Sequence, residues 1–182
     1  MQVSNSHSRF GVVSIALHWL VAVVVFGLFG LGYYMVDLTY YDEWYRSAPH
    51  IHKSVGLLLL GTVVLRVIWR LANTQPAPLA SHQRWEVLAA HLVHGLLYLL
   101  LFVAMISGYL ISTLDGSSID VFNWFSVPSV TGKMRFLEEI VGTVHYWATW
   151  AVVVLAGLHG LAAVKHHVID KDNTLRRMVG RD

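Results

Sequence analysis

Histidines inside apolar stretches are the residues of this sequence best suited to chemistry. The chain has 11 histidines. An ionisable side chain within a long apolar stretch is costly and usually serves a function. Neutral imidazole offers one lone pair, which binds a metal ion or the iron of a haem. The histidines inside or at the ends of such stretches are His18, His52, His91, His94, His145 and His159. His7 and His82 lie in segments that we expect to be exposed.

Two of these histidines share the last apolar stretch. His145 and His159 are 14 residues apart. At about 100° and 1.5 Å per residue, a helix places them within roughly 40° of the same face and some 21 Å apart along its axis. One helix therefore offers two ligands at different depths.

The direction of the other stretches supplies a partner for each of these two ligands. His18, near the start of the first stretch, is expected level with His159, and His52, near the start of the second, level with His145. Imidazoles from facing helices are the usual axial ligands of b haem in a helical bundle. The pattern predicts two haem b groups, although any one of these histidines taken alone is as well explained by a hydrogen-bonded core histidine.

Arg66 is the charged residue that this pattern singles out. It lies 14 residues after His52, so it should share the face of His52 but lie at the depth of the other histidine pair. A haem propionate there would neutralise its charge. The alternative is an arginine whose guanidinium reaches the membrane surface. Lys53, next to His52, is a weaker candidate for the same contact with a haem propionate at the other histidine pair.

His91 and His94 are one helical turn apart and can face the same ligand. No carboxylate occurs in their stretch to complete a metal site. For both histidines we favour a place beside a haem, outside the iron ligands, or a contact with quinone. The alternative is that they are ordinary histidines at the membrane surface. A second candidate set for quinone binding or proton delivery follows the last stretch, where a basic tail is equally expected from topology. These residues are Lys165, His166, His167, Lys171 and Asp172.

The elements that must position these residues are membrane spans. Hydrophobic residues make up 55% of the 182 residues and charged residues 13%, against roughly 25% charged in soluble proteins. A span needs about 20 apolar residues. We expect an all-α, integral membrane four-helix bundle that forms a single domain over residues 1–182. The expected spans are Val12–Val36, Pro49–Leu71, Val87–Thr113 and Ile140–Val164.

Cysteine and charge exclude several classes of protein. The chain has no cysteine, which excludes disulfides, thiolate zinc sites, iron–sulfur clusters and covalently attached c-type haem. The net charge of +2 gives no indication of nucleic-acid binding.

The distribution of positive charge predicts orientation. Nine of the 13 lysines and arginines lie in or nearest to the terminal segments and the second connector, and four lie in or nearest to the other two connectors. The positive-inside rule then places both termini in the cytoplasm. In a Gram-negative bacterium the membrane would be the bacterial inner membrane, and the outward side would be the periplasm.

Together these residues resemble the prokaryotic cytochrome b561 family along nearly the whole chain. The matching elements are Ser14-x-x-x-His18-Trp19, His52-x-x-x-Gly56 leading to Arg66, His91-x-x-His94, His145, Gly157-Leu158-His159, Lys165-His166-His167 and Lys171-Asp172-Asn173-Thr174-Leu175. The resemblance implies an inner haem on His18 and His159 and an outer haem on His52 and His145. It also implies electron exchange with membrane quinone. One activity in that family is oxidation of superoxide with quinone as acceptor, so superoxide is one candidate for the outer-side donor.

Two other functions fit part of the pattern. A di-haem cytochrome can serve as the membrane anchor and electron conduit of a separate dehydrogenase or hydrogenase, in which case a large soluble partner should copurify with it. A histidine-lined metal-ion transporter is the other alternative. Its spans should carry Asp or Glu for a divalent cation, and the four expected spans have none in their interior.

Overall fold

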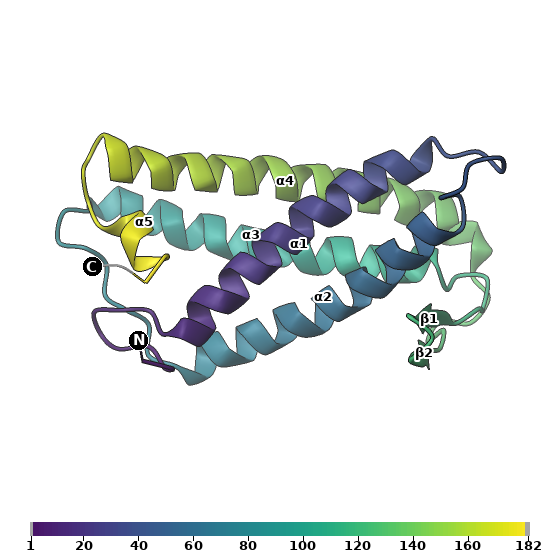
Figure 1. Ribbon diagram of the computed structural model, residues 1–182, viewed down its shortest axis with the longest axis horizontal. Helices are drawn as coiled ribbons and strands as arrows, with labels where there is room; N and C mark the ends of the chain where they lie inside the picture. The colour runs from purple at the N-terminus through teal and green to yellow at the C-terminus, as the bar shows by residue number, and fades with distance from the viewer. Residues whose placement is uncertain (1, 181–182) are drawn as a thin grey trace. The chain divides into compact units, whose positions relative to one another are not determined.

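Four long helices dominate the protein. The computed structural model describes residues 2–180. Its long helices are α1 Val12–Val36, α2 Ser47–Ala72, α3 Arg84–Ile111 and α4 Glu138–Val168 (Figure 1). Each is long and apolar enough to cross a membrane. The expected all-α membrane fold with four spans is thus confirmed. The shorter elements are β1 Ile119–Val121, β2 Phe125–Val127, a 3₁₀ turn at Arg135–Leu137 and α5 Thr174–Arg177.

The helix ends differ from the predicted spans by at most a few residues: α1 coincides with its span, α3 ends at Ile111 where Thr113 was expected, and the other differences are extensions with local reasons. α2 begins at Ser47, ahead of Pro49, because the first turn of a helix does not need the N–H that proline lacks. α3 begins at Arg84, where the Glu86 carboxylate accepts a hydrogen bond from the Gln83 amide at 2.9 Å and satisfies one free donor of the first turn. α4 begins with two acidic residues, which are favourable near a helix N-terminus.

The chain forms two compact units, and each contains a part of every long helix. Unit 1 comprises residues 2–22, Thr62–Tyr98 and 154–180. Polar contacts tie its segments together: the Trp69 indole donates to Ser14 Oγ at 3.1 Å, and the Trp19 indole donates to the Met178 carbonyl at 2.7 Å. The Arg177 guanidinium adds a bond to the Ala77 carbonyl at 3.0 Å. The C-terminal tail is therefore held against α1 and the connector between α2 and α3.

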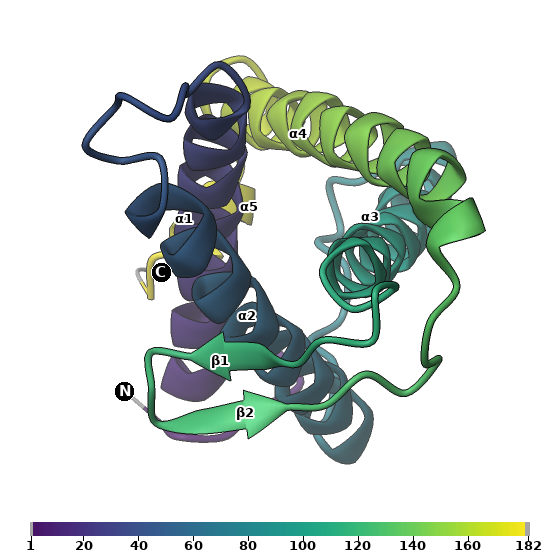
Figure 2. The ribbon, with the colours of Figure 1, turned by 90° about the vertical axis from the view of Figure 1, so that its right-hand side faces the viewer.

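Unit 2 comprises Val23–Gly61 and Leu99–Val153 and contains a small hairpin (Figure 2). β1 and β2 pair antiparallel, with Ile119 opposite Val127 and Val121 opposite Phe125. Ile119 and Val121 are buried, while the facing strand is more exposed. The sequence predicted only a connector between the third and fourth spans here, because strands of three residues carry too little alternation to be recognised.

The hairpin is fastened to α2 by Ser54. This serine is fully buried; its hydroxyl accepts a hydrogen bond from the Phe122 amide at 3.2 Å and lies 3.3 Å from the Asp120 carbonyl, to which it donates. Phe122 and Asn123 form the turn with φ values of 46° and 59°. Two such residues in succession are typical of the tight turns that join twisted strands. Because Ser54 lies two residues after His52, the hairpin is attached beside that histidine.

Few apolar side chains are buried among the described residues. The buried ones include Val21 and Val63 in unit 1 and Leu59 and Val152 in unit 2. Large apolar side chains such as Leu65, Leu99 and Leu161 remain exposed along the helices. A soluble protein rarely shows such continuous apolar exposure, so lipid is the solvent that these helix surfaces require.

Candidate functional site

The first candidate site is a histidine pair in unit 1. His18 comes from the first half of α1 and His159 from the second half of α4. Their ring centres are 6.4 Å apart and the ring planes are inclined by 78°. Both side chains are half-buried. The structure thus brings together the two histidines that the sequence paired by depth.

The second candidate site is a histidine pair in unit 2. His52 of α2 and His145 of α4 have ring centres 6.3 Å apart and an inclination of 78°. Nδ1 of His145 lies 2.8 Å from the Ala104 carbonyl, which can only accept a hydrogen bond. His145 therefore carries its proton on Nδ1 and keeps the Nε2 lone pair free for a metal.

The spacing of both pairs fits axial ligation of a haem iron. With a metal–imidazole distance of about 2.0–2.1 Å, as for zinc, and roughly 1.1 Å from each nitrogen to its ring centre, two imidazoles on opposite sides of one metal have ring centres about 6.3 Å apart. The two observed spacings are 6.4 Å and 6.3 Å. The residues present therefore suit one haem in each unit.

Two glycines make room for the imidazoles of unit 2. A Cβ on Gly32 would lie 3.1 Å from Cε1 of His52, and one on Gly108 would lie 3.0 Å from Cε1 of His145. Any larger residue would push the ring. Sequence reasoning missed both positions, because nothing in the local pattern distinguishes Gly32 from Gly27 or Gly30.

Four other glycines close to the histidines in the sequence have no such contacts. Among the described residues, and apart from the backbone of its own helix, a Cβ at any of them would meet no atom within 4 Å. These residues are Gly56, Gly142, Gly157 and Gly160.

Arg66 lies beside the pair of unit 1. Its Nη2 is 2.9 Å from Nδ1 of His18, and its guanidinium is 5.7 Å from the ring centre of Tyr98. Arginine only donates, so Nδ1 of His18 accepts here, and a neutral His18 then carries its proton on Nε2. Ligation through Nε2 therefore requires Arg66 to take another acceptor.

The structure separates the two histidines of α3. The ring of His94 is half-buried, with its centre 5.0 Å from that of His159. This spacing is too short for two ligands on opposite sides of one iron, so His94 is a neighbour of the pair. His91 is exposed, and its Nδ1 bonds the Val87 carbonyl at 2.7 Å on its own helix.

The comparisons with known proteins agree with this arrangement. Residues 9–181 match the family model described as prokaryotic cytochrome b561. The chain belongs to the prokaryotic cytochrome b561 family. It is 50% identical over 181 residues to cytochrome b561 homolog 2 of Escherichia coli (strain K12), a match that covers 100% of this chain and 96% of the relative.

Two more distant relatives match over similar lengths. The chain is 28% identical over 178 residues to the probable superoxide oxidase CybB of Yersinia pestis, which covers 95% of this chain and 97% of the relative. It is 26% identical over 180 residues to cytochrome b561 homolog 1 of Escherichia coli (strain K12), covering 96% and 98%. As a b561 protein, the chain is a multi-pass bacterial membrane protein of electron transfer, and family membership implies that it binds haem b.

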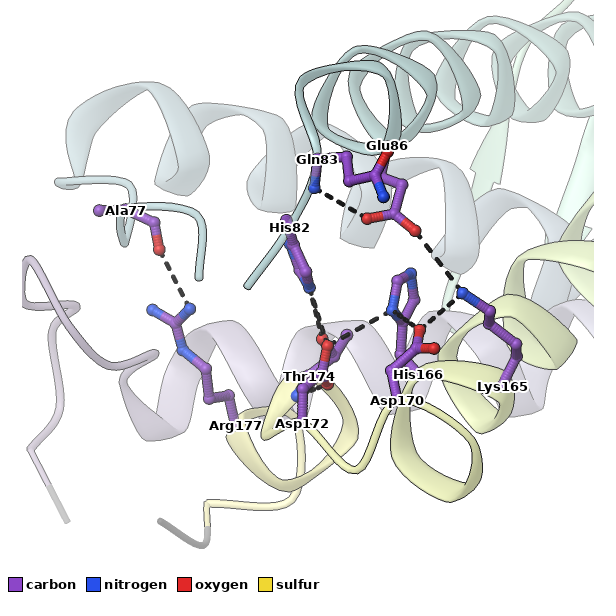
Figure 3. A network of polar contacts seen from close by, with 10 residues as sticks. All are labelled: Ala77, His82, Gln83, Glu86, Lys165, His166, Asp170, Asp172, Thr174 and Arg177. Carbon is purple, nitrogen blue, oxygen red and sulfur yellow. Dashed lines mark hydrogen bonds and ion pairs between the residues drawn. The ribbon is translucent and has the colours of Figure 1, made fainter. Parts of the chain in front are cut away.

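The polar tail of this b561 protein divides into separate groups. Lys165, His166 and Asp172 belong to a network of polar contacts at the end of α4 (Figure 3). His167 instead lines a pocket of about 410 Å³, and Lys171 is exposed with a φ of 55°. The five tail residues therefore do not form one site.

The network contains residues that sequence reasoning missed. His82, expected in an exposed segment, is half-buried, and its Nε2 lies 3.0 Å from Oδ2 of Asp172. Glu86 and Asp170 join through Lys165, at 3.6 Å and 2.6 Å from its Nζ. Their separation along the chain concealed this contact, which needs the start of α3 beside the end of α4.

Asp172 is held as a carboxylate by its own turn. Burial raises its pKa, but hydrogen bonds from the Thr174 amide, the Thr174 hydroxyl and His82 outweigh burial, and the pKa lies below the usual value for aspartate. Oδ1 accepts the Thr174 amide at 2.8 Å. Asp172 therefore stays charged at neutral pH, with Oδ2 toward His82.

Proposed function

We propose that this protein is a di-haem cytochrome b that transfers electrons through the cytoplasmic membrane between a donor on the outer side and membrane quinone. The observation that carries the proposal is the near-equal spacing of the two histidine pairs, 6.4 Å and 6.3 Å, which suits two axial ligand sets. His18 and His159 would hold the inner haem, and His52 and His145 the outer one. The 14-residue spacing of His145 and His159 on α4 supports two separate layers.

Haem iron supplies one-electron oxidation and reduction when bound. The residues of the protein would set the orientation and the surroundings of each haem. The bond from His145 Nδ1 to the Ala104 carbonyl fixes the tautomer and ring direction of that ligand. Gly108 and Gly32 keep both rings of the outer pair close to the helix backbones.

Arg66 has the charge and position to hold a haem propionate at the inner site. It lies on α2, half-buried, next to His18. A guanidinium at this depth needs an anionic acceptor, and a carboxylate would free Nδ1 of His18 to carry the proton that Nε2 ligation requires. Arg66 would also raise the reduction potential of that haem, because its positive charge favours the added electron.

The pocket beside α1 in unit 1 suits a quinone ring. It is mainly apolar and is lined by Trp19, His167, Leu175, Arg176 and Val179. Trp19 follows the ligand His18, so the pocket adjoins the inner histidine pair in sequence. Nδ1 of His167 is buried and has no hydrogen-bond partner within the described residues, which leaves it free for a quinone carbonyl. We assign quinone binding to this pocket in preference to His91, which is exposed, and we place His94 beside the inner haem.

Superoxide is the donor that one relative suggests. The relative at 28% identity is called a probable superoxide oxidase, whereas the one at 50% identity carries only the cytochrome name. Two superoxide anions would each give one electron and leave as dioxygen, and the quinone would take both electrons with two protons. The protons would enter from the cytoplasmic side, where the charge distribution places the termini.

Haem content and quinone reduction test this function in separate steps. The purified protein should contain two haem b per chain by pyridine haemochrome assay, and one or none would contradict the ligand assignment. In liposomes that contain ubiquinone, enzymatically generated superoxide should drive quinone reduction in the wild type but not in His52→Ala. If a soluble reductant reduces the haems but superoxide does not drive quinone reduction, the protein is still a cytochrome but superoxide is not its donor. Copurification of a large soluble dehydrogenase would favour the anchor role.

A further inference from the structure

A second group of metal-ligating side chains lies away from both histidine pairs of the proposed haem sites. His82 Nε2, His166 Nδ1 and a carboxylate oxygen of Asp172 all lie within 4.8 Å of one another (Figure 3). A ring nitrogen of His166 also lies within 4.8 Å of carboxylate oxygens of Glu86 and Asp170. His166 is thus shared by two overlapping sets of donors.

Two imidazole nitrogens converge on one carboxylate oxygen. Oδ2 of Asp172 is 3.0 Å from His82 Nε2 and 3.3 Å from His166 Nδ1. The centres of the two imidazole rings are 4.9 Å apart, and the ring planes are inclined by 44°. Such convergence from three chain segments is the arrangement that a shared cation requires.

His166 lacks the hydrogen bond that would explain its position. Its Nδ1 is buried, and within the described residues it makes no contact of hydrogen-bond geometry, although Asp170 Oδ2 is only 2.8 Å away. A buried imidazole nitrogen close to two carboxylates but bonded to neither is a costly arrangement. A metal ion between these donors would satisfy all of them.

Charge balance also favours a divalent cation. The carboxylates of Glu86, Asp170 and Asp172 bring three negative charges, and Lys165, which pairs with the first two, brings one positive charge. With both imidazoles neutral, as metal ligation requires, the group carries a net charge of −2. One divalent ion neutralises it.

The donor set selects the class of metal. Two imidazoles with carboxylates suit zinc and neighbouring first-row transition metals, whereas magnesium and calcium prefer oxygen ligands throughout. The carboxylate is also supported from behind, because the Thr174 amide donates to Oδ1 of Asp172 at 2.8 Å and leaves Oδ2 toward the imidazoles. Such outer contacts orient ligands in metal sites.

We propose that His82, His166 and Asp172 bind one divalent transition-metal ion of the zinc class, with Asp170 or a water molecule as the fourth ligand. The ion joins the connector before α3, the last turn of α4 and the turn before α5. It thereby fastens the C-terminal tail next to His167. This site is independent of the haems, and its occupancy is measurable whether or not the proposed electron transfer is correct.

Zinc binding by the purified holoprotein tests the site. After removal of the affinity tag and treatment with chelator, calorimetric titration with Zn²⁺ should show one ion per chain. His82→Gln and Asp172→Asn should each weaken the affinity at least tenfold, while His91→Gln, which changes an exposed histidine, should not. Neither Mg²⁺ nor Ca²⁺ at millimolar concentration should displace the zinc. Unchanged affinity in both site variants, or equal loss in the control, would overturn the proposal.

A measurement on the wild-type protein tests the site even if the variants fail to fold. Zinc K-edge X-ray absorption of the loaded protein should show two imidazoles among the ligands. A shell of oxygen atoms alone, or a single imidazole, would place the zinc elsewhere. Haem absorbance and circular dichroism of each variant establish that the fold is retained before its affinity is compared.

Discussion

Gly108 of α3 lies against the ring of His145 so closely that a Cβ on the glycine would be 3.0 Å from Cε1 of the imidazole. Gly32 of α1 has the same relationship to His52, at 3.1 Å. Each histidine of the outer pair is thus positioned by a glycine on a neighbouring helix. The positions of the proposed haem ligands in this unit therefore depend on close helix approach as well as on the histidines themselves.

Gly108→Ala should therefore impair the outer haem site. The added methyl must displace the His145 ring by a few tenths of an ångström, which strains its bond to the Ala104 carbonyl. We expect partial loss of one haem per chain, measured by pyridine haemochrome and low-temperature spectra.

Gly142→Ala is the matched control, because within residues 2–180, and apart from the backbone of its own helix, a Cβ there meets nothing within 4 Å. That change should keep both haems and, by helix propensity, stabilise the helix by up to about 1 kcal/mol. Full haem content in both variants would show that the His145 ring has freedom to move.

The histidine pairs should define two classes of variant. His18→Ala and His159→Ala should each lose the inner haem alone, and the double variant should be little worse than either single one, because both residues act through one bound group. His52→Ala and His145→Ala should form the second class. Haem stoichiometry and spectra of the four single and two double variants decide this.

His94→Ala separates a ligand from a neighbour at the inner site. Because His94 is only 5.0 Å from His159 by ring centres, we expect both haems to be retained in this variant. Loss of a haem comparable to that in His18→Ala would instead make His94 a ligand. If His18→Ala and His52→Ala lost the same haem, the pairing of the histidines proposed here would be wrong.

Arg66→Leu should lower the midpoint potential of the inner haem by on the order of 100 mV. A unit charge about 8 Å away contributes roughly 2 kcal/mol at an effective dielectric constant of about 20. The outer midpoint should stay nearly constant in a redox titration. Arg66→Lys should restore most of the potential, and Arg84→Leu, at an exposed position, should change neither midpoint. Equal shifts of both haems would remove Arg66 from the inner site.

Leu175→Trp should fill the proposed quinone pocket, and His167→Ala should remove its buried imidazole nitrogen. Both changes should raise the KM for quinone severalfold while haem content and potentials stay normal. Lys171→Ala serves as control because that side chain is exposed. Normal quinone kinetics in both pocket variants would place the quinone elsewhere.

The four spans could be predicted because hydrophobicity is a property of each segment alone. A continuous apolar stretch of about 20 residues must form its backbone hydrogen bonds within a helix when it lies in lipid. The first expected span therefore coincided with α1, Val12–Val36. The hairpin of β1 and β2 could not be predicted, because its strands are short and its support comes from Ser54, more than 60 residues earlier in the chain. Membrane orientation and the single domain remain predictions from the sequence.

The histidine pairs also followed from the sequence, since helix periodicity and chain direction fix the depth of each residue along its own helix. Which side chains surround them depended on how the helices approach one another. That approach brought Gly32 and Gly108 against the rings, separated His94 from His91, and joined His82 to His166 and Asp172. Contacts between distant segments arise from packing, which depends on the shape and charge of both segments together. A local pattern along one segment therefore cannot predict them.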